Sequence, residues 1–383
     1  MKKSAHECDR THNMHIDDLL RIAMERKASD LHLKVGNFPH IRIDGELVPL
    51  SEQTRVSAED MLNMAFSMMS NRQKQKFKEA AELDMAYGVA GLGRFRVNVF
   101  QQRGNVGLVL RVIPTKIRSL DELYLPAIVE KICEEARGLV LVTGVTGSGK
   151  STTLAAIIDR INSTRPEHIM TIEDPIEFLH RDKRGFVNQR EVEVDTPSFA
   201  SALRASLRQD PDVILVGEMR DLETISTALH AAETGHMVFS TLHTLDAAET
   251  INRIISVFPP PEQKQVRVQL ASTLKAVVSQ RLVKRCDQAG RVPAVEVLIS
   301  TAYIRECVMT PEKTRNIKEA LSQGTSQYGM QTFDQSLYDL YQQGLIDYAT
   351  ALENASNPDD FKLRVQGISG TAESTRDSSF SGR

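Results

Sequence analysis

The sequence has few cysteines, no long apolar run and no excess of positive charge. Its four cysteines, Cys8, Cys133, Cys286 and Cys307, show no C-x-x-C spacing. They are too few and too scattered for a disulfide framework or a zinc knuckle, which favours a reducing compartment such as the cytoplasm. No stretch approaches the roughly 20 apolar residues that cross a bilayer, and the polar N-terminus lacks the apolar core of a signal peptide. We therefore expect any membrane association to be peripheral and to go through partner proteins.

The charge balance bears on nucleic-acid binding. The formal net charge is −3, from 47 basic and 50 acidic residues. A dedicated nucleic-acid-binding protein normally has a basic excess, so we expect no such function. The short basic segments at 181–184 and 281–285 are interpreted as solvated faces. The length of 383 residues predicts two or three domains.

The first third predicts a small α+β domain. A segment with apolar residues at helical spacing comes first, and Asp44-Gly45 between alternating apolar residues predicts a β-hairpin. A later strand has two distinct faces because side chains alternate along it. One face carries Phe95, Val97 and Val99, and the other carries Arg94, Arg96 and Asn98.

From residue 126 onward the pattern changes to apolar strand, Gly-rich turn and helix, repeatedly. This order predicts a mostly parallel sheet flanked by helices. The segment 259–283 is predicted to start one long helix after a proline stop. Phe333, Leu337 and Leu340 predict a helix near the C-terminus that Gly344 ends. The predicted boundaries are a flexible N-terminus (1–14), the α+β domain (15–113), a linker (114–125), the sheet-and-helix core (126–290), a C-terminal helical region (291–366) and a disordered tail (367–383).

The segment GVTGSGKS, residues 144–151, has the spacing of a phosphate-binding loop. An apolar strand precedes it and a helix follows, as the mechanism demands. The glycines allow backbone N–H groups to turn inward around phosphate oxygens. We expect Lys150 to reach the β- and γ-phosphates of ATP, Ser151 to ligate Mg²⁺ and Thr152 to lie near the α-phosphate. The other predicted nucleotide-binding residues of the loop are Gly144, Thr146, Gly147, Ser148 and Gly149.

Two apolar strands end in acidic residues. The segment 168–178 ends in Glu173, Asp174 and, past a proline turn, Glu177, and the segment 211–221 has Gly217-Glu218 after its apolar run. The ends of parallel strands converge on a ligand crevice, where one acid must activate water and another must help hold Mg²⁺. Glu173 and Asp174 have the alternative role of capping the next element. The position of 168–178 between the loop and the metal strand fits RecA-like ATPases, which have an extra strand between these two.

Two histidines flank another predicted strand. His236 stands at its start and His243 at its end. A lone histidine is more often structural, and no second ligand suggests a metal site. His243, at the carboxyl end of the strand, is a candidate to hydrogen-bond the γ-phosphate and report its presence.

Four segments, in this order, resemble the motifs of the secretion ATPase superfamily of type II secretion and type IV pili. GVTGSGKSTTLAAIID resembles the Walker A motif, TIEDPIEF the Asp box, LRQDPDVILVGEMRDLET the Walker B segment and AETGHMVFSTLHT the His box. The similarity extends over residues ~15 to ~366 and is greatest to the pilus retraction ATPases. It implies an α/β fold: a RecA-like P-loop ATPase core with an N-terminal α+β PAS-like domain and C-terminal helices.

The resemblance also implies an activity and its residues. It implies ATP hydrolysis with Mg²⁺ by a homo-hexamer on the cytoplasmic side of the inner membrane, where an inner-membrane platform protein of a type IV pilus machine is the partner. By this likeness Glu218 acts with Ser151 on the Mg²⁺ side and Glu177 is the catalytic base. The expected catalytic residues are Lys150, Glu177, Glu218 and His243, with Arg96 and Arg111 reaching a neighbour's phosphates in trans and Arg94 contributing to nucleotide binding.

Two departures from the family pattern refine this interpretation. Extension ATPases typically carry an added N-terminal domain and often a paired-cysteine zinc element. Neither is found here, which favours retraction. The retraction family also has a C-terminal AIRNLIRE-type motif, and the corresponding segment here keeps only Ile304-Arg305-Glu306. The alternatives are an accessory or regulatory paralogue of the pilus motor and, with less support, a DNA-translocating ATPase.

Overall fold

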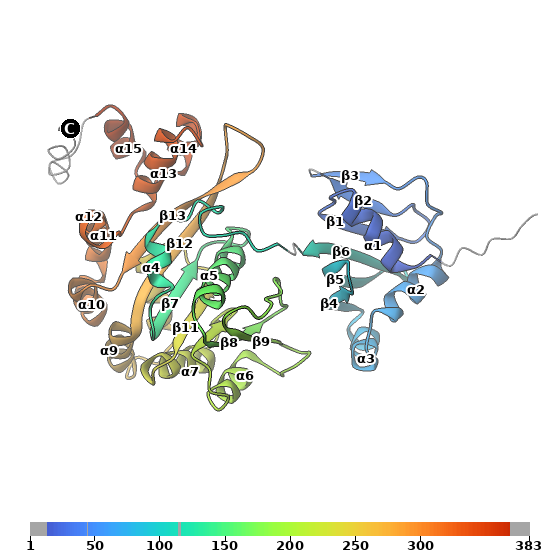
Figure 1. Ribbon diagram of the computed structural model, residues 1–383, viewed down its shortest axis with the longest axis horizontal. Coiled ribbons are helices and arrows are strands. Elements are labelled where there is room, and N and C mark those ends of the chain that lie inside the picture. The colour runs from blue at the N-terminus through green and yellow to red at the C-terminus, as the bar shows by residue number, and fades with distance from the viewer. Residues whose placement is uncertain (1–13, 44, 114–115, 368–383) are drawn as a thin grey trace, which may run out of the picture. The chain divides into compact units, whose positions relative to one another are not determined.

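The computed structural model describes residues 14–43, 45–113 and 116–367. The chain divides into two compact units, Met1–Lys116 and Ile117–Arg383, each of which is described by itself (Figure 1). The flexible ends predicted at 1–14 and 367–383 lie almost wholly outside the described residues. Within the described part, no helix is long and apolar enough to cross a membrane.

The first unit is built on a six-stranded antiparallel sheet of order β3-β2-β1-β6-β5-β4. The predicted hairpin is formed by β2 and β3, although Asp44 itself lies outside the described residues. The strands are β1 (Asp30–Lys34), β2 (His40–Ile43), β3 (Glu46–Pro49), β4 (Glu82–Val89), β5 (Gly93–Gln102) and β6 (Asn105–Ile113), and the helices are α1 (Ile16–Glu25), α2 (Ala58–Ser67) and α3 (Asn71–Ala80).

The two faces of β5 differ as its alternation predicts. Phe95, Val97 and Val99 are fully buried in one core cluster with residues of the three helices. The other face of the strand is polar and partly exposed. This face of the first unit carries the arginines that the sequence singled out.

The second unit contains a seven-stranded sheet of order β13-β12-β7-β11-β10-β8-β9. All neighbouring strands are parallel except the last pair, β12 and β13. The strands are β7 (Gly138–Thr143), β8 (His168–Glu173), β9 (Phe186–Glu191), β10 (Val213–Val216), β11 (Met237–Leu242), β12 (Leu274–Lys284) and β13 (Arg291–Ile299).

Helices cover both faces of this sheet, which is why its central strands are apolar throughout. Every residue of β7, β10 and β11 is buried. The helices α4 (Ile128–Ile132) and α5 (Lys150–Thr164) pack on one face. The other face is covered by α6 (Phe199–Ser206), α7 (Leu222–Glu233), α8 (Ala247–Ser256), α9 (Gln263–Thr273), α10 (Ala302–Met309) and α11 (Ile317–Gln323).

The strand between the phosphate-loop strand and the metal strand differs from our prediction. It is β11, which comes after both in the sequence, and β8 pairs with the far side of β10. The RecA-like arrangement with one inserted strand is therefore present, but residues 168–173 do not provide it. Apolar strands buried on both faces look alike in sequence, so their order in the sheet is not readable from composition.

The predicted long helix at 259–283 was wrong in its second half. Helix α9 ends at Thr273, and Leu274 begins β12 at once. The chain extends because β12 completes the sheet beside β7 and pairs with β13 on its other side. Residues 291–299, predicted to open a helical region, are the strand β13 of the same sheet.

The C-terminal helices form a further cluster around the ends of β12 and β13. Phe333, Leu337 and Leu340 are buried there, as their spacing predicts, and Gly344 follows the helix with φ 70°. The remaining helical segments are a 3₁₀ helix (Pro311–Asn316), α12 (Thr325–Tyr328), α13 (Phe333–Gln342), α14 (Tyr348–Asn354) and α15 (Pro358–Val365). At the start of the unit, Leu120 and Leu125 are buried in the same core cluster as residues of α4 and α5.

Candidate nucleotide site

The loop of residues 144–151 connects β7 to α5 and depends on glycine. Gly144, Gly147 and Gly149 have φ values of 140°, 79° and 95°, in the region that residues with a side chain rarely adopt. Gly144 also makes a close approach, since a Cβ atom there would lie 2.4 Å from the main-chain oxygen of Gln280. The glycines therefore give the loop a backbone that other residues would strain.

Lys150 is the first residue of α5, and its ammonium group lies within the curl of the loop. Its Nζ donates to the main-chain oxygens of Gly144 at 2.8 Å and Val145 at 3.1 Å. Burial lowers the pKa of Lys150, while the charges of Glu218 and Glu177 act to raise it. The structure thus brings both predicted acids into electrostatic range of this lysine.

The other loop residues differ in exposure. Thr146 and Ser151 are exposed and Thr152 is half-buried, so their hydroxyls are open to a ligand. Ser148 is 2% exposed, and its Oγ has no hydrogen-bond partner among the described residues. The exposed part of the loop therefore lies at the N-terminus of a fifteen-residue helix. Backbone N–H groups at such a helix start bind phosphates.

Glu218 follows β10 and is held by two donors. Its Oε1 accepts from Nε of Arg220 at 2.6 Å and lies 3.2 Å from Nε2 of His243. Burial raises the pKa of Glu218, but these two neighbours outweigh burial and the pKa lies below its ordinary value. The carboxylate is therefore ionised, and His243 at the end of β11 is part of its setting.

The second histidine of this segment has a structural contact. Nδ1 of His236 lies 3.0 Å from the main-chain oxygen of Ala231 in α7. It thus joins the end of the helix to the start of β11, away from the loop that carries Lys150.

Gly217 occupies the place where many ATPases have an aspartate, and its packing explains the glycine. Its N–H donates to the oxygen of Ile172 at 2.8 Å. A Cβ atom at Gly217 would lie 3.1 Å from that oxygen and 3.4 Å from Cα of Glu173. The end of β10 thus lies close against the backbone of β8, and a side chain here would require that backbone to shift slightly.

The loop after β8 is fastened by buried polar groups. The carboxylate of Glu173 accepts from Oγ1 of Thr171 at 2.7 Å and from Nε2 of Gln189 at 3.1 Å, and it also interacts with the backbone of Glu177. Burial raises the pKa of Glu173. Ile176 N–H donates to Glu191 at 3.1 Å. Glu173 therefore anchors the loop that carries Glu177.

Asp174, the neighbour of Glu173, is exposed and interacts electrostatically with Arg220. Sequence reasoning missed Arg220, Gln189 and Glu191 as partners of the acidic residues. Only Arg220, two positions after Glu218, was visible as a nearby charge in the sequence.

In the first unit, a row of charged residues crosses four strands. Asp30 is the direct cross-strand neighbour of Arg42 on β2 and Arg111 on β6, and Arg96 on β5 is opposite Arg111. Asp30 is only 6% exposed; its Oδ1 accepts from Nε of Arg111 at 3.0 Å, and Oδ2 lies 4.0 Å from Nε of Arg42. Sequence reasoning identified Arg96 and Arg111 but missed Asp30, which fixes one of them.

Arg94 lies on the same face of β5 as Arg96 and is half-buried. The predicted residues Arg94, Arg96 and Arg111 thus share one face of the first unit. The charged row on this face contains three arginines, Arg42, Arg96 and Arg111, and one aspartate, Asp30.

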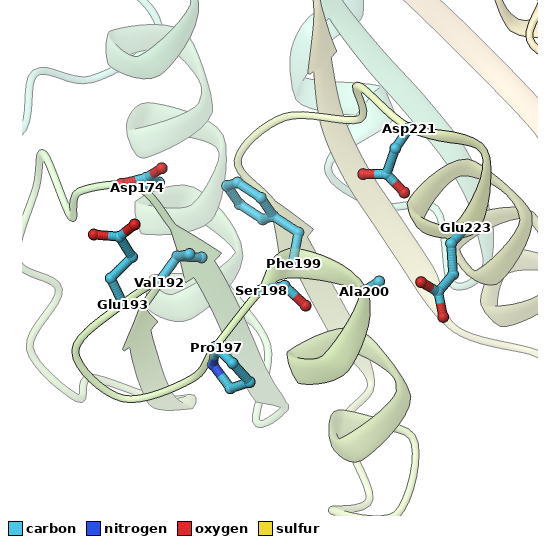
Figure 2. A pocket seen from close by; sticks show the side chains of 9 residues that line it. All are labelled: Asp174, Val192, Glu193, Pro197, Ser198, Phe199, Ala200, Asp221 and Glu223. Atoms are coloured by element: carbon cyan, nitrogen blue, oxygen red, sulfur yellow. The ribbon is translucent and has the colours of Figure 1, made fainter.

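A pocket of about 280 Å³ lies beside the acidic loop rather than at the phosphate loop. Figure 2 shows Asp174 and Glu193 on one side of it and Asp221 and Glu223 on the other, with Phe199 between them. Four carboxylates repel phosphate oxygens, so this pocket does not suit the phosphates of a nucleotide. Its lining is Asp174, Val192, Glu193, Pro197, Ser198, Phe199, Ala200, Asp221 and Glu223.

The residues around the phosphate loop fit a nucleotide with its magnesium ion. The described residues contain no group of three His, Cys, Asp or Glu side chains able to hold a metal alone. Mg²⁺ in phosphate-transfer sites usually needs only one or two protein ligands because the phosphates supply others. Ser151 and Glu218 are the candidate ligands for such an ion.

Comparisons with known proteins agree with this geometry. The family model described as type II/IV secretion system protein matches residues 7–344. The chain is 47% identical over 352 residues to the type IV pilus retraction ATPase PilT of Pseudomonas aeruginosa, covering 91% of this chain and 100% of PilT. It is 42% identical over 353 residues to the type IV pilus ATPase PilU of the same organism, covering 92% of each.

Solved structures are similar over nearly the whole chain. A crystal structure of the pilus retraction motor PilT with bound ADP has a TM-score of 0.84 at 48% identity, covering 90% of this chain and 98% of that one. The ATPase DotB of Legionella pneumophila has a TM-score of 0.77 at 29% identity, covering 92% of this chain and 95% of that one. By its phosphate loop, its fold and its matched length, the chain belongs to the type II/IV secretion system protein family.

Proposed function

We propose that this chain is a motor ATPase that hydrolyses ATP and drives retraction of a type IV pilus. The observation that carries the proposal is the 47% identity that spans the full length of PilT. The geometry of the phosphate loop supports it, since Lys150 and the start of α5 form a phosphate-binding arrangement with Glu177 and Glu218 in range.

Phosphate binding is the first step in this account. The N–H groups of residues 147–151 surround the β-phosphate, and Lys150 exchanges the carbonyls of Gly144 and Val145 for phosphate oxygens. Ser151 and Glu218 are the residues that would hold Mg²⁺. When bound, this ion neutralises charge that develops on the phosphate oxygens.

The hydrolytic step requires a base for the attacking water. We assign this role to Glu177, on the loop that Glu173 and Glu191 fasten. Glu177 takes the proton as the water oxygen bonds to the γ-phosphorus and the bond to the β–γ bridging oxygen breaks. Glu218 is less suited because Arg220 and His243 both contact its Oε1 and hold its pKa below the ordinary value, which makes it a weaker base. His243, which lies beside Glu218 at the end of β11, is the candidate to hydrogen-bond the γ-phosphate and report its presence.

We assign the arginines of the first unit to catalysis in a neighbouring subunit. Arg94, Arg96 and Arg111 of one subunit approach the phosphates bound to a neighbour in a homo-hexamer. Arginine supplied in trans speeds phosphoryl transfer on the order of 10³–10⁵-fold. The proposed partner is the inner-membrane platform protein of the pilus machine, reached from the cytoplasmic side.

The experiment is complementation of a Pseudomonas aeruginosa strain that lacks PilT. Expression of this chain restores twitching on agar, whereas an equal amount of the Lys150→Ala variant does not. Stable expression without any recovery of twitching, in a strain where PilT itself restores it, counts against retraction by this chain alone.

A second candidate function is that of an accessory motor subunit. The 42% identity to PilU over 92% of both chains favours it, as does the segment 301–317, which departs from the retraction pattern. This reading predicts that twitching recovers only when PilT is also present. Expression in strains that lack PilU alone, PilT alone or both separates the two roles.

A further inference from the structure

Strand β12 passes directly behind the phosphate loop. Ser279 pairs with Thr143, the last residue of β7, and their hydroxyls are 2.9 Å apart. The main-chain oxygen of Gln280 limits the space at Gly144, and methyl groups of Leu282 lie 3.8 and 3.9 Å from where a Cβ of Gly149 would stand. Residues of β12 thus contact the end of β7 and two glycines of the loop.

The side chain of Gln280 is buried between the strand and the first turn of α5. The residue is 2% exposed, and its Nε2 donates to Oγ1 of Thr153 at 2.8 Å. Thr153 stands three positions after Lys150 and is itself buried. The amide therefore links β12 to the helical turn that follows the phosphate loop.

Two buried polar atoms beside this link have no partner among the described residues. They are Oε1 of Gln280 and Oγ of Ser148. A Cβ atom built on Gly144 would lie 2.6 Å from that Ser148 oxygen and 2.4 Å from the main-chain oxygen of Gln280, so the serine hydroxyl and the glutamine backbone meet at one place. Folded proteins satisfy nearly all buried polar atoms, and an exception requires a reason.

Packing alone does not supply that reason. Leucine has nearly the same volume and carries no buried polar atom of its own that needs a partner. A glutamine has an advantage over leucine if its Oε1 accepts a hydrogen bond when the loop changes conformation. The hydroxyl of Ser148, inside the loop, lies near the main chain of Gln280 and is likewise without a partner among the described residues.

We propose that Gln280 is a positioning residue for the phosphate loop. Its Nε2 holds the start of α5 through Thr153, and its oxygen accepts from Ser148 when the loop closes on a phosphate. Gln280 does not contact the nucleotide, and it acts through the loop alone. This inference rests on the proposed function, because it concerns the binding of ATP and ADP.

The test uses the full chain and a fluorescent ADP analogue. Variants Gln280→Leu, Thr153→Val and the double variant are compared with wild type for Kd, and for KM and kcat with ATP. Loss of such a neutral hydrogen bond weakens binding roughly two- to tenfold. We expect Kd and KM to rise by this factor in each variant, with kcat little changed. We also expect the double variant to be no weaker than the stronger single one, since both remove the same link.

Gln335 provides the control, because it is equally buried at 4% exposed and caps α13 far along the chain. Gln335→Leu lowers the melting temperature and leaves Kd unchanged, which is the behaviour of a merely structural glutamine. The same pattern for Gln280→Leu overturns the inference. If that variant does not fold, an unchanged Kd in Thr153→Val overturns it equally. A wild-type chain that binds no nucleotide instead refutes the proposed function.

Discussion

Gly217 illustrates how one residue defines the metal-side segment. The N–H of Gly217 donates to the main-chain oxygen of Ile172, and a Cβ atom built on Gly217 would lie 3.1 Å from that oxygen. A side chain at this position would contact the backbone of β8 more tightly than an ordinary van der Waals contact. The first carboxylate after β10 is therefore that of Glu218, one residue further along the chain.

We predict that Gly217→Ala destabilises the second unit by about 1–3 kcal/mol, the usual cost of overpacking. The thermal unfolding midpoint measures this effect. Gly88→Ala is the matched control, because Gly88 also has an ordinary φ and nothing lies within 4 Å of its added Cβ. Equal midpoints for the two variants would show that Gly217 is not confined by β8.

Asp30 is the residue that holds the arginine row of the first unit together. Burial raises the pKa of Asp30, but the hydrogen bonds from Ser29 and Arg111 outweigh it and the pKa lies below its ordinary value. A carboxyl group with a lowered folded-state pKa stabilises the protein above its unfolded pKa of about 4 and loses that effect as the pH falls further.

We therefore predict that Asp30→Asn weakens the pairing of β1 with β6 by about 1–3 kcal/mol at pH 7. Native-state hydrogen exchange of the amides in these strands measures it. The difference from wild type narrows as the pH falls below 4. Asp18→Asn, whose side chain is 66% exposed beside Arg21, is the control and changes little. A difference for Asp30→Asn that does not depend on pH contradicts the role of its charge.

At this scale, sequence reasoning found the residues that carry recognisable motifs. Lys150 and Ser151 have a fixed spacing, and Glu177 and Glu218 follow apolar strands. The residues that hold them, such as Gln280 and Glu173, depend on strand register and burial. Neither is visible in local sequence, since an isolated glutamine or glutamate gives no signal of its partner.

At the scale of elements, β12 connects the two sides of the second unit. Gln280 faces the phosphate loop, whereas the next residue, Arg281, contacts the C-terminal helices. Its guanidinium lies 3.9 Å from the ring centre of Phe333 and its Nη1 donates to Asn354 at 3.3 Å. Successive residues of a strand point to opposite faces, so one strand serves both.

We predict that Arg281→Ala loosens α13 and α14 without loosening α5. The lost cation–π contact is worth about 1–2 kcal/mol at a partly buried site. Hydrogen exchange by mass spectrometry measures the change helix by helix. Arg253→Ala, an exposed arginine of α8, is the matched control. If hydrogen exchange in α13 and α14 is as slow in Arg281→Ala as in Arg253→Ala, Arg281 does not anchor these helices.

The segment of α9 and β12 shows why one long helix was predicted at 259–283. QVRVQLASTLKAVVSQRLV has helical spacing at its start and β-branched residues later, and no glycine or proline separates the two. The change from helix to strand at Leu274 is imposed by the free edge of β7 and by β13. Tertiary pairing of this kind overrides local propensity. The loop-and-helix unit at 144–164 was predictable because its motif includes its own structural context.

For the whole molecule, the account requires catalysis across subunits. A subunit with Arg96→Ala and Arg111→Ala keeps its phosphate loop, and a Lys150→Ala subunit keeps its arginines. Mixing the two before assembly is predicted to restore part of the ATPase activity that each lacks alone. The steady-state rate against mixing ratio measures this recovery. Activity that stays at the sum of the separate rates, in assemblies shown to be mixed, rules out sharing of these arginines between subunits.

The central claim is that this chain hydrolyses ATP and that Glu177 activates the water. The most direct test is the Mg²⁺-dependent ATPase rate of wild type and Glu177→Gln, with ATP binding measured on the same samples. We expect measurable turnover for wild type, and for Glu177→Gln an unchanged affinity with a rate on the order of 10²–10⁴-fold lower. A Glu177→Gln variant that binds ATP and turns it over as fast as wild type would contradict the account.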